Sequence, residues 1–404
     1  MVLKCSSFIQ QPQLCAEEAT RGQVSHQASE MFAALLLSAG LALAVSAEPS
    51  VTTYNGGKVP TAGELIFEDN FDQLDLATWQ HELTLWGGGN NEFEGYNNNR
   101  TNSYIRDGVL YLRPTLTAER YGEDYLYSGT LNMHGGAPFD QCTNPLNYGC
   151  ERQGSYEHIL NPIMSAAMRT PLSFSFKYGR VEARAKMPAG DWIWPAIWMM
   201  PVREVYGNWP TSGEIDIVES RGNRDLLRPS DNLQIGVKQV ASTMHWGADF
   251  PSNQWPRTHY ELNDEAGFDA DFHVYGVEWT PEGITFSVDG ADIGNVTPPE
   301  GGFWELGEFD QDTWRDNPWQ GRSKMAPFDQ EFYLKLNVAV GGTGVAGSGT
   351  FFEDSYINGN GAKPWNNTSP TAYRDFWEGR DQWLPTWTGD DTAMQVDYIR
   401  VYAL

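Results

Sequence analysis

The alternation of polar and apolar residues in several short segments is the feature that most constrains the fold of this chain. Arg180–Met187 alternates for eight residues, as a half-buried β-strand does. No window of twelve or more residues after residue 47 carries a convincing helical stripe. Strand-like segments of alternating, β-branched or aromatic residues recur at four further places: Phe272–Trp279, Ile284–Val288, Glu331–Val340 and Val396–Tyr402. The pattern therefore predicts an all-β protein.

The composition narrows the architecture within that class. The 404 residues include 41 Gly and 23 Pro, which favours many short strands joined by turns. Neither an internal repeat nor a low-complexity linker interrupts residues 48–404, so we expect a single domain, a β-sandwich of the jelly-roll kind. The glycine-rich stretch 341–387 is expected to be a long loop region that its aromatic residues keep packed. The 16 Trp, 18 Tyr and 19 Phe also suggest stacking platforms for the flat apolar faces of a ligand.

The charge balance excludes several classes of partner. The chain has 53 acidic and 27 basic residues, a formal net charge of −26. Proteins that bind nucleic acid neutralise phosphates with clustered Lys and Arg, so we expect no nucleic-acid partner. Polyanionic substrates are disfavoured for the same electrostatic reason. Disorder is excluded as well, because 40% of the residues are hydrophobic.

The first 47 residues are interpreted as a leader. Phe32–Val45 is an apolar run of 14 residues, shorter than the roughly 20 that a membrane-spanning helix needs. The run ends in Val45-Ser46-Ala47, small residues of the kind that a signal peptidase requires. We therefore expect a signal peptide cleaved after Ala47, with Met31 as a candidate true start. The mature protein is expected to be secreted and extracellular, with no membrane partner.

Removal of the leader leaves Cys142 and Cys150 as the remaining cysteines. Two cysteines eight positions apart in a secreted chain predict one disulfide that closes a surface loop. A metal site is the weaker alternative, because neither a Cys nor a His pair stands nearby at ligand spacing. Four Asn-x-Ser/Thr sequons, each a weak signal alone, fit an exported glycoprotein: Asn99, Asn295, Asn366 and Asn367.

Three carboxylates in one predicted strand are the candidate catalytic residues. Glu214 and Asp216 share one face of the strand because side chains alternate. Glu219 falls on the opposite face unless a β-bulge near Val218 absorbs one residue, and such bulges occur next to active sites. Acids crowded on one face repel one another and drive their pKa values apart. The triple by itself is equally compatible with a solvated acidic strand.

Tryptophans just before this strand add to the catalytic interpretation. Two carboxyls about 5–5.5 Å apart are the machinery of a retaining glycosidase. Trp192, Trp194 and Trp198 stand close together in the sequence, and the latter two are placed to line a groove in which sugar rings stack on indoles. Each indole taken alone is also typical of a hydrophobic core. The three together favour a sugar-binding wall.

Several runs in consistent order carry a family resemblance. The principal ones are Phe176–Arg184 (FKYGRVEAR), Trp194–Trp198 (WPAIW) and Gly213–Glu219 (GEIDIVE). The chain thereby resembles glycoside hydrolase family 16, in particular its laminarinase branch of endo-β-1,3-glucanases and the related invertebrate β-1,3-glucan recognition proteins. Supporting matches spread over about residues 60–404: GNNE at 89–92, NPIMS at 161–165, HW at 245–246, KMAPFD at 324–329, NVAVGG at 337–342 and QVDYIRVY at 395–402.

The resemblance implies a fold and a catalytic machinery. The fold is a concanavalin A-like jelly-roll β-sandwich with a substrate cleft across its concave face. Glu214 resembles the nucleophile of the family and Glu219 its general acid/base, and Asp216 resembles the carboxylate that orients and tunes the nucleophile. The reaction that these residues imply is hydrolysis by double displacement with retained β configuration.

The resemblance also implies residues that bind the substrate. Asn91 and Arg180 resemble groups that hydrogen-bond sugar hydroxyls. Trp194 and Trp198 resemble the stacking wall, and His245 resembles a polar group beside the acid/base. These roles are expectations carried over position by position.

We therefore expect a secreted, monomeric endo-1,3-β-glucanase (laminarinase) that takes neutral β-1,3-glucan and needs neither a cofactor nor a metal. Some members of the family hold calcium on the convex side, and Asp397 lies in the matching strand, but one acid does not make a site. Two other functions stay open: a non-catalytic β-1,3-glucan-binding pattern-recognition protein, and a carbohydrate-binding lectin jelly roll that accounts for the tryptophans but not for the acids. Retention of Glu214, Asp216 and Glu219 favours the enzyme, because such receptors lose one or both glutamates.

Overall fold

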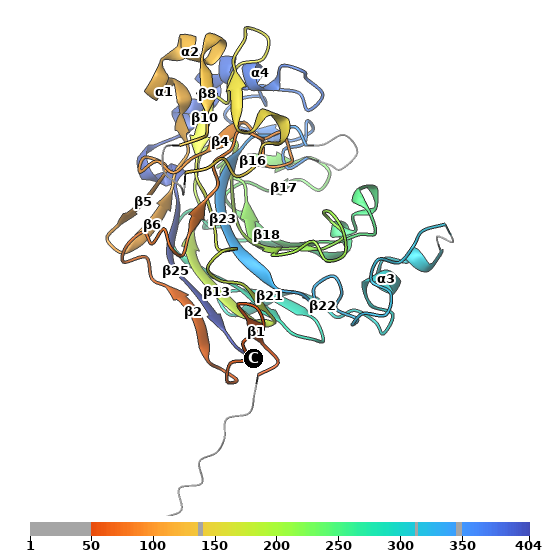
Figure 1. Cartoon of the computed structure of the whole chain (residues 1–404). Helices are drawn as coiled ribbons and strands as arrows, with labels where there is room; N and C mark the ends of the chain where they lie inside the picture. Colours follow the sequence, from red (N-terminus) through yellow and green to blue (C-terminus); the bar gives the residue numbers. More distant parts are fainter. Residues whose placement is uncertain (1–49, 136–139, 312–313, 345–349) are drawn as a thin grey trace, which may run out of the picture. The chain divides into compact units, whose positions relative to one another are not determined.

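The computed structural model describes residues 50–135, 140–311, 314–344 and 350–404 (Figure 1). Contacts between Cα atoms group Ala47–Leu404 into one compact unit, to which every element named below belongs. The leader expected over residues 1–47 lies outside the described residues. Within the described ranges, no helix is long and apolar enough to cross a membrane.

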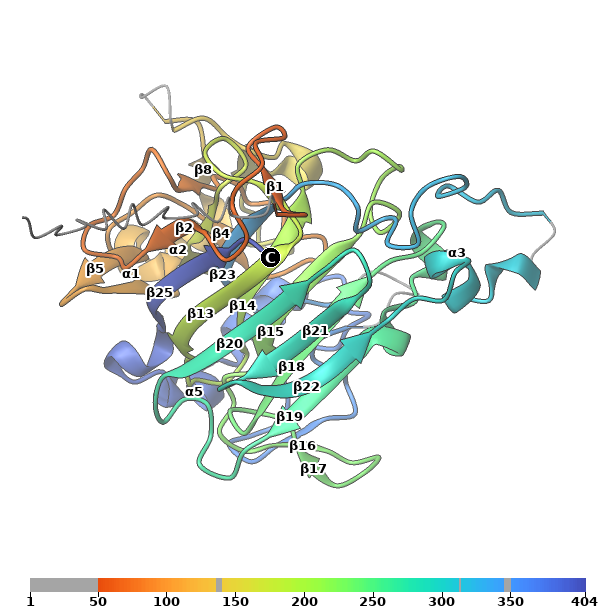
Figure 2. The ribbon, with the colours of Figure 1, turned by 90° about the horizontal axis from the view of Figure 1, so that it is seen from below.

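Two antiparallel sheets form the framework of this unit, and Figure 2 shows them as two layers, with β20, β21 and β22 in front of β15 and β18. The order of the nine-stranded sheet is β1-β12-β23-β14-β15-β18-β19, with β11 and then β3 attached through β23. Its strands are β1 (Thr53–Tyr54), β3 (Gln80–His81), β11 (Ala167–Arg169), β12 (Phe176–Lys177), β14 (Ile193–Pro201), β15 (Glu214–Ser220), β18 (Gln239–His245), β19 (His259–Asn263) and β23 (Phe332–Val340).

The eight-stranded sheet has the order β22-β21-β20-β13-β25-β6-β5, with β2 also paired to β25. Its strands are β2 (Leu65–Asp69), β5 (Ser103–Arg106), β6 (Val109–Leu112), β13 (Gly179–Lys186), β20 (His273–Trp279), β21 (Ile284–Val288), β22 (Ala291–Val296) and β25 (Met394–Tyr402). The five strands predicted from the sequence are confirmed as β13, β20, β21, β23 and β25.

Short elements surround the sandwich. Three small sheets contain β4 (Glu94–Tyr96), β7 (Thr115–Leu116) and β10 (Ile163–Ser165); β8 (Thr130–Asn132) and β9 (Glu151–Gln153); and β16 (Leu226–Arg228), β17 (Leu233–Gln234) and β24 (Ile357–Asn358). The helices are α1 (Thr117–Tyr121), α2 (Glu123–Ser128), α3 (Gly302–Leu306), α4 (Ala372–Glu378) and α5 (Arg380–Trp383). In Figure 1, α1, α2, α4 and β8 gather at one end of the sandwich. Strands hold 34% of the described residues, and helices together with 3₁₀ turns hold 14%, which confirms the all-β class.

The main hydrophobic core lies between the two sheets. Val181 and Ala183 project inward from β13, and Ile197 and Leu336 project inward from β14 and β23. All four side chains are fully buried, and the polar residues that alternate with them point away from the core. The alternation read from the sequence is therefore what assembles the sandwich.

Tryptophans and phenylalanines form a second core that packs the C-terminal part. Trp192 is buried there together with Phe352, Trp365 and Trp383, so it belongs to the core. The segment 341–387 is packed by its aromatic residues as expected. It is not entirely loop, however, because it also contains β24, α4 and α5. Helices this short escape a search for helical periodicity, because they complete fewer than two turns.

The predicted disulfide between Cys142 and Cys150 is confirmed. The two cysteines are eight positions apart in the sequence, and the loop that they close leads into β9. The loop has only a three-residue 3₁₀ turn at Leu146–Tyr148, so the covalent bond supplies an order that regular structure does not.

Candidate active site

A one-residue bulge in β15 brings the three carboxylates onto one face. Asp216 and Glu219, three positions apart, pair with Thr243 and Ala241 of β18, which are two positions apart. The pairing with β14 shifts at the same place, where Val218 and Asp216 face consecutive residues. Ile217 and Val218 both turn into the core, and Glu219 returns to the face of Asp216. The bulge predicted from the i, i+2, i+5 spacing is therefore present.

Asp216 and Glu219 stand in two neighbouring rows that cross the nine-stranded sheet on the face away from the core, and Glu214 pairs with His245 in a third. The row through Asp216 has, as successive Cα partners, Gln80, Arg169, Lys335, Trp198, Asp216, Thr243 and His259. The row through Glu219 has Ala167, Asn337, Ala196, Glu219, Ala241 and Glu261. The second row carries short alanine side chains on both sides of Glu219, whereas the first row carries long polar and aromatic side chains.

Two hydrogen bonds hold Glu214. The indole Nε1 of Trp209 donates to its Oε2 at 2.8 Å, and Asp216 is hydrogen-bonded to the same carboxyl. Burial and then the charge of Glu219 raise the pKa of Glu214 to about 7, while the bonds from Trp209 and Asp216 act to lower it. Both donors stabilise the ionised form of Glu214, as a nucleophile requires.

Asp216 retains its proton most strongly of the three acids. Burial first, and then the charges of Glu214 and Glu219, raise the pKa of Asp216 well above its ordinary value. A protonated carboxyl can donate, so Asp216 donates its hydrogen bond to the carboxylate of Glu214. Because carboxyl groups this close together cannot all be ionised, Asp216, which lies between the two glutamates in the sequence, keeps its proton.

His245 faces the Glu214–Asp216 pair as a neutral side chain. Nδ1 of His245 lies 2.9 Å from Nδ2 of Asn253, whose Oδ1 accepts from the backbone N–H groups of Trp246 and Trp255. That arrangement fixes the amide, so Nδ1 accepts and the proton sits on Nε2. Burial lowers the pKa of His245 to about 3. Its Nε2–H lies 3.4 Å from Oδ2 of Asp216.

Glu219 has a different environment from Glu214. Nε1 of Trp194 donates to Oε1 of Glu219 at 2.8 Å. Burial raises the pKa of Glu219, and the bond from Trp194 acts against that rise. Phe351 stacks on the indole of Trp194 with ring centroids 4.0 Å apart, and the guanidinium of Arg221 lies 4.0 Å from the centroid of Phe351. Trp194 thus holds the acid and has one indole face already covered.

A hydrogen bond from its Nε1 and a lysine over its ring hold Trp198 in place. Nε1 donates to Oδ1 of Asn337 at 2.6 Å, and Nζ of Lys335 lies 4.4 Å from the ring centroid. Lys335 and Arg169 both pair with Glu82, at 2.8 and 3.3 Å. Although burial acts to raise it, these two cations hold the pKa of Glu82 below its ordinary value. Two cations that share one carboxylate therefore hold this end of the row in place.

Three of the predicted binding residues lie elsewhere than expected. Arg180 is wrong as a sugar ligand of this site: it stands on β13 in the other sheet, is exposed, and pairs with Glu182. Its neighbour Val181 points into the core, so alternation turns Arg180 to the opposite outer surface. His245 lies beside Glu214 and Asp216 rather than beside Glu219, because it is the Cα partner of Glu214.

Asn91 occupies a loop that contacts the end of the nine-stranded sheet. Its Nδ2 donates to Oγ1 of Thr343, three positions after β23, and its side chain lines a separate cavity. Trp194 and Trp198, by contrast, are next to the carboxylates, as predicted.

The described residues contain one group of three side chains whose spacing suits a metal ion, Glu214, Asp216 and His245. The bond from Asn253 leaves the proton of His245 on the nitrogen that faces the carboxyls, and Asp216 retains its own proton. Both features oppose a metal there. Asp397, considered for calcium, accepts a hydrogen bond from Arg184 at 2.6 Å.

Sequence reasoning missed Trp209, Asn253, Lys335 and Arg169. Trp209 precedes the strand in a loop, and Asn253 follows β18 in another. Loop residues carry no periodicity from which their direction can be read. Lys335 stands on a strand that the sequence predicted and Arg169 on a short strand that it did not, and the position of both next to Trp198 depends on which strands pair.

A two-layer antiparallel β-sandwich whose outer sheet face carries a bulged row of carboxyls, flanked by indoles, defines a carbohydrate-active jelly roll. A family model described as glycosyl hydrolases family 16 matches residues 146–309. The chain is also 49% identical over 352 residues to the β-1,3-glucan-binding protein of Penaeus monodon, covering 84% of this chain and 90% of that protein. The chain belongs to glycosyl hydrolase family 16 and is homologous to β-1,3-glucan-binding proteins.

Further comparisons agree on the fold. β-1,3-Glucan-binding protein 1 of Galleria mellonella is 35% identical over 349 residues, which cover 85% of this chain and 64% of that protein. The chain thus spans less than two thirds of the moth relative. The laminarinase structure from Rhodothermus marinus superposes with a TM-score of 0.50 at 25% identity, over 84% of this chain and 97% of that one. The predicted jelly roll is confirmed.

Proposed function

We propose that this protein is an endo-acting, retaining glycosidase that hydrolyses neutral β-1,3-glucan of the laminarin kind. The observation that carries the proposal is the bulge in β15, which puts Glu214 and Glu219 on one face but gives them different partners. Burial raises the pKa of both glutamates, but Glu214 accepts hydrogen bonds from Trp209 and Asp216, whereas Glu219 accepts one from Trp194. Glu214 is thus suited to be the nucleophile, and Glu219 the acid/base.

The proposed reaction has two balanced steps. Glu219 gives its proton to the glycosidic oxygen while the carboxylate of Glu214 attacks the anomeric carbon, so the C–O bond breaks and a glycosyl ester forms. Glu219, now ionised, takes a proton from water, and the water oxygen displaces Glu214. Two inversions at one carbon leave the β configuration unchanged. Asp216 holds Glu214 in place through both steps.

Further features support a neutral β-glucan as the substrate. The R. marinus neighbour is a laminarinase, and the P. monodon relative is named for binding β-1,3-glucan. Short alanine side chains flank Glu219, and Trp198 places an indole in the adjoining row. A formal charge of −26 opposes sulfated or uronic-acid polymers. We also propose that the protein acts outside the cell as a monomer, without a cofactor.

A non-catalytic glucan-binding function is the second candidate. The specific observation in its favour is the name of the P. monodon relative, with which the chain shares 49% identity over nearly its whole length. Binding alone would use the indoles and the polar rows but would not require two glutamates in contrasting environments.

The decisive experiment separates hydrolysis from binding. Products from laminarin and from mixed-linkage glucan are separated by chromatography for the unmodified protein, for Glu214→Gln, and for Arg180→Ala as a matched surface control. We expect oligosaccharide products, with the β anomer first by NMR, from the unmodified protein and from Arg180→Ala. Glu214→Gln should bind laminarin without cleaving it. Substantial hydrolysis by Glu214→Gln would contradict the assignment, and binding with no hydrolysis by any form would establish the receptor function.

Secretion has its own test. N-terminal sequencing of protein collected from the medium of a eukaryotic host should give Glu48 as the first residue. A mature chain that retains residues 4–30 would refute the proposed leader.

A further inference from the structure

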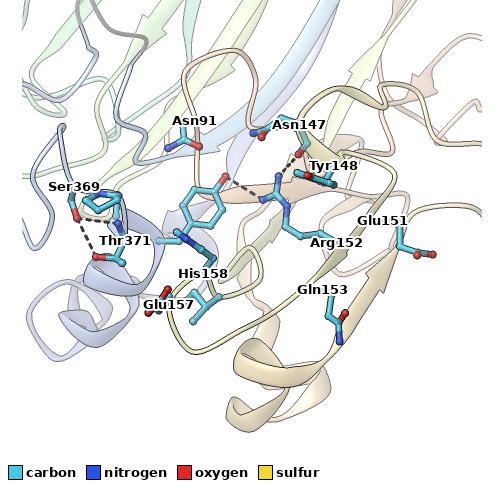
Figure 3. A pocket seen from close by; sticks show the side chains of 14 residues that line it. Asn91, Asn147, Tyr148, Glu151, Arg152, Gln153, Glu157, His158, Ser369 and Thr371 are labelled. Carbon is cyan, nitrogen blue, oxygen red and sulfur yellow. Dashed lines mark hydrogen bonds between the residues drawn. The ribbon is translucent and has the colours of Figure 1, made fainter.

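We propose that a cavity beside the disulfide-closed loop is a second saccharide-binding site, separate from the carboxylate rows. The cavity has a volume of about 590 Å³, within the range of small-molecule sites. Asn91 and three segments line it: the tip of the loop closed by Cys142 and Cys150, residues 151–153 and 157–159 in and after β9, and residues 369–373 at the beginning of α4 (Figure 3). None of its lining residues belongs to the two rows.

A fixed guanidinium and a tyrosine connect these three segments. Nη1 of Arg152 donates to Oδ1 of Asn161 at 2.7 Å, and Nη2 donates to the carbonyl of Asn147 at 2.7 Å. Nη1 also lies 3.5 Å from the hydroxyl of Tyr373, which in turn donates to the carbonyl of Glu92 at 2.7 Å. Because these bonds are made within the protein, the cavity is formed before a ligand arrives, which reduces the entropic cost of binding.

The chemistry of the lining suits a neutral polyhydroxyl ligand. Asn91, Asn147 and Gln153 offer amides, which both donate and accept hydrogen bonds as sugar hydroxyls do. The carboxylates Glu151 and Glu157 outnumber the one guanidinium of Arg152 in the lining, so an anionic ligand is disfavoured.

Tyr148 supplies the stacking surface at the rim of this cavity. Its side chain is 78% exposed, and its backbone φ of 58° lies in the left-handed region that bulky residues avoid. The preceding Asn147 has φ 49°, and the disulfide to Cys150 lies two positions later. The loop thus exposes a large aromatic ring to water on a strained backbone. A buried ring, or a glycine at position 148, would make the protein more stable. Sugar C–H faces stack on such rings.

The position of Asn91 relates the cavity to the candidate active site. Asn91 lines the cavity and bonds Thr343, and the carbonyl of Asn90 accepts from the N–H groups of Thr343 and Gly344. That segment directly follows β23, whose last residue pairs with Ile193 at the beginning of β14, next to Trp194. The second site therefore adjoins the end of the sheet on which Trp194 holds Glu219. The inference rests on the proposed affinity for glucan but not on hydrolysis.

The test compares two exposed tyrosines by calorimetric titration with laminarihexaose and laminarin. Tyr148→Gly removes the ring and relieves the left-handed strain, so the variant should resist denaturant at least as well as the unmodified chain. Tyr156→Ala is the matched control, because Tyr156 is 71% exposed in the same region but does not line the cavity. Both changes are made in the Glu214→Gln background, which prevents turnover from obscuring binding.

We expect two binding sites in the background protein and in Tyr156→Ala. Tyr148→Gly should lose the second site or bind the saccharide there about 3- to 10-fold more weakly, which is the range expected from the loss of one aromatic contact. Unchanged affinity and stoichiometry in Tyr148→Gly would overturn the proposal, as would a single site in the background protein. Absence of hydrolysis in the unmodified chain would refute the proposed enzyme but would leave this titration interpretable.

Discussion

Glu214→Gln is expected to stabilise the folded protein by a margin that grows with pH. In the folded state burial and Glu219 raise the pKa of Glu214 from an ordinary 4.5 to about 7. Below pH 4.5 the residue is protonated in both the folded and the unfolded chain, so its replacement by neutral glutamine changes the stability little. Between pH 4.5 and 7 the unfolded chain ionises this residue while the folded chain keeps the proton, which lowers the stability of the unmodified protein as the pH rises.

The size of the margin follows from the same pKa values. Each pH unit across that interval corresponds to about 1.4 kcal/mol, so the variant should be about 3 kcal/mol more stable above pH 7. Glutamine is isosteric and its amide oxygen can still accept from Trp209, so the margin reflects the lost charge rather than lost packing. The three acids share their environment, which makes the figure an upper value.

Urea denaturation at pH 4, 5, 6, 7 and 8 measures this margin. Glu278→Gln, the same substitution at an exposed glutamate on β20, is the control. A Glu214→Gln margin that is the same at pH 4 and pH 8 would refute the burial and crowding described for the three acids. The same protein should be inactive on laminarin, so a gain of stability and a loss of activity would appear together, as expected where acids are kept crowded for chemistry.

Three other perturbations test separate parts of the structure. Trp194→Phe removes a donor that favours the ionised form of Glu219, so the alkaline limb of the pH–activity profile should move to higher pH; an unchanged limb would contradict that pairing. In protein secreted from a eukaryotic host, we expect peptide mapping to find a glycan on Asn366 and not on Asn367, because both polar atoms of the Asn367 amide bond within the fold; a glycan on Asn367 would contradict this. Replacing both disulfide-bonded cysteines by serine should cost about 2.5 kcal/mol of unfolding free energy if loop-closure entropy dominates, and an unchanged urea midpoint would show that the loop is ordered without the bond.

The sequence by itself determined five of the strands and the grouping of three acids in a sixth. Alternation located β13, β20, β21, β23 and β25, because the direction of successive side chains in a strand depends only on the local backbone. The same rule required a bulge near Val218 if the acids were to share a face. The short separation of Cys142 and Cys150 along the chain was enough to predict that they form a disulfide.

Tertiary structure decided which residues meet. Arg180 stands on β13, a strand predicted from its alternation, and Trp198 on β14, which was not predicted. Because β13 joined one sheet and β14 the other, Arg180 faces solvent and Trp198 faces the carboxyls. Trp209 donates to Glu214 and Asn253 orients His245 from loops whose directions no periodicity encodes. The unequal pKa values of the three acids depend on burial and on those partners. Pairing register and packing join residues more than a hundred positions apart, and no local pattern specifies such contacts.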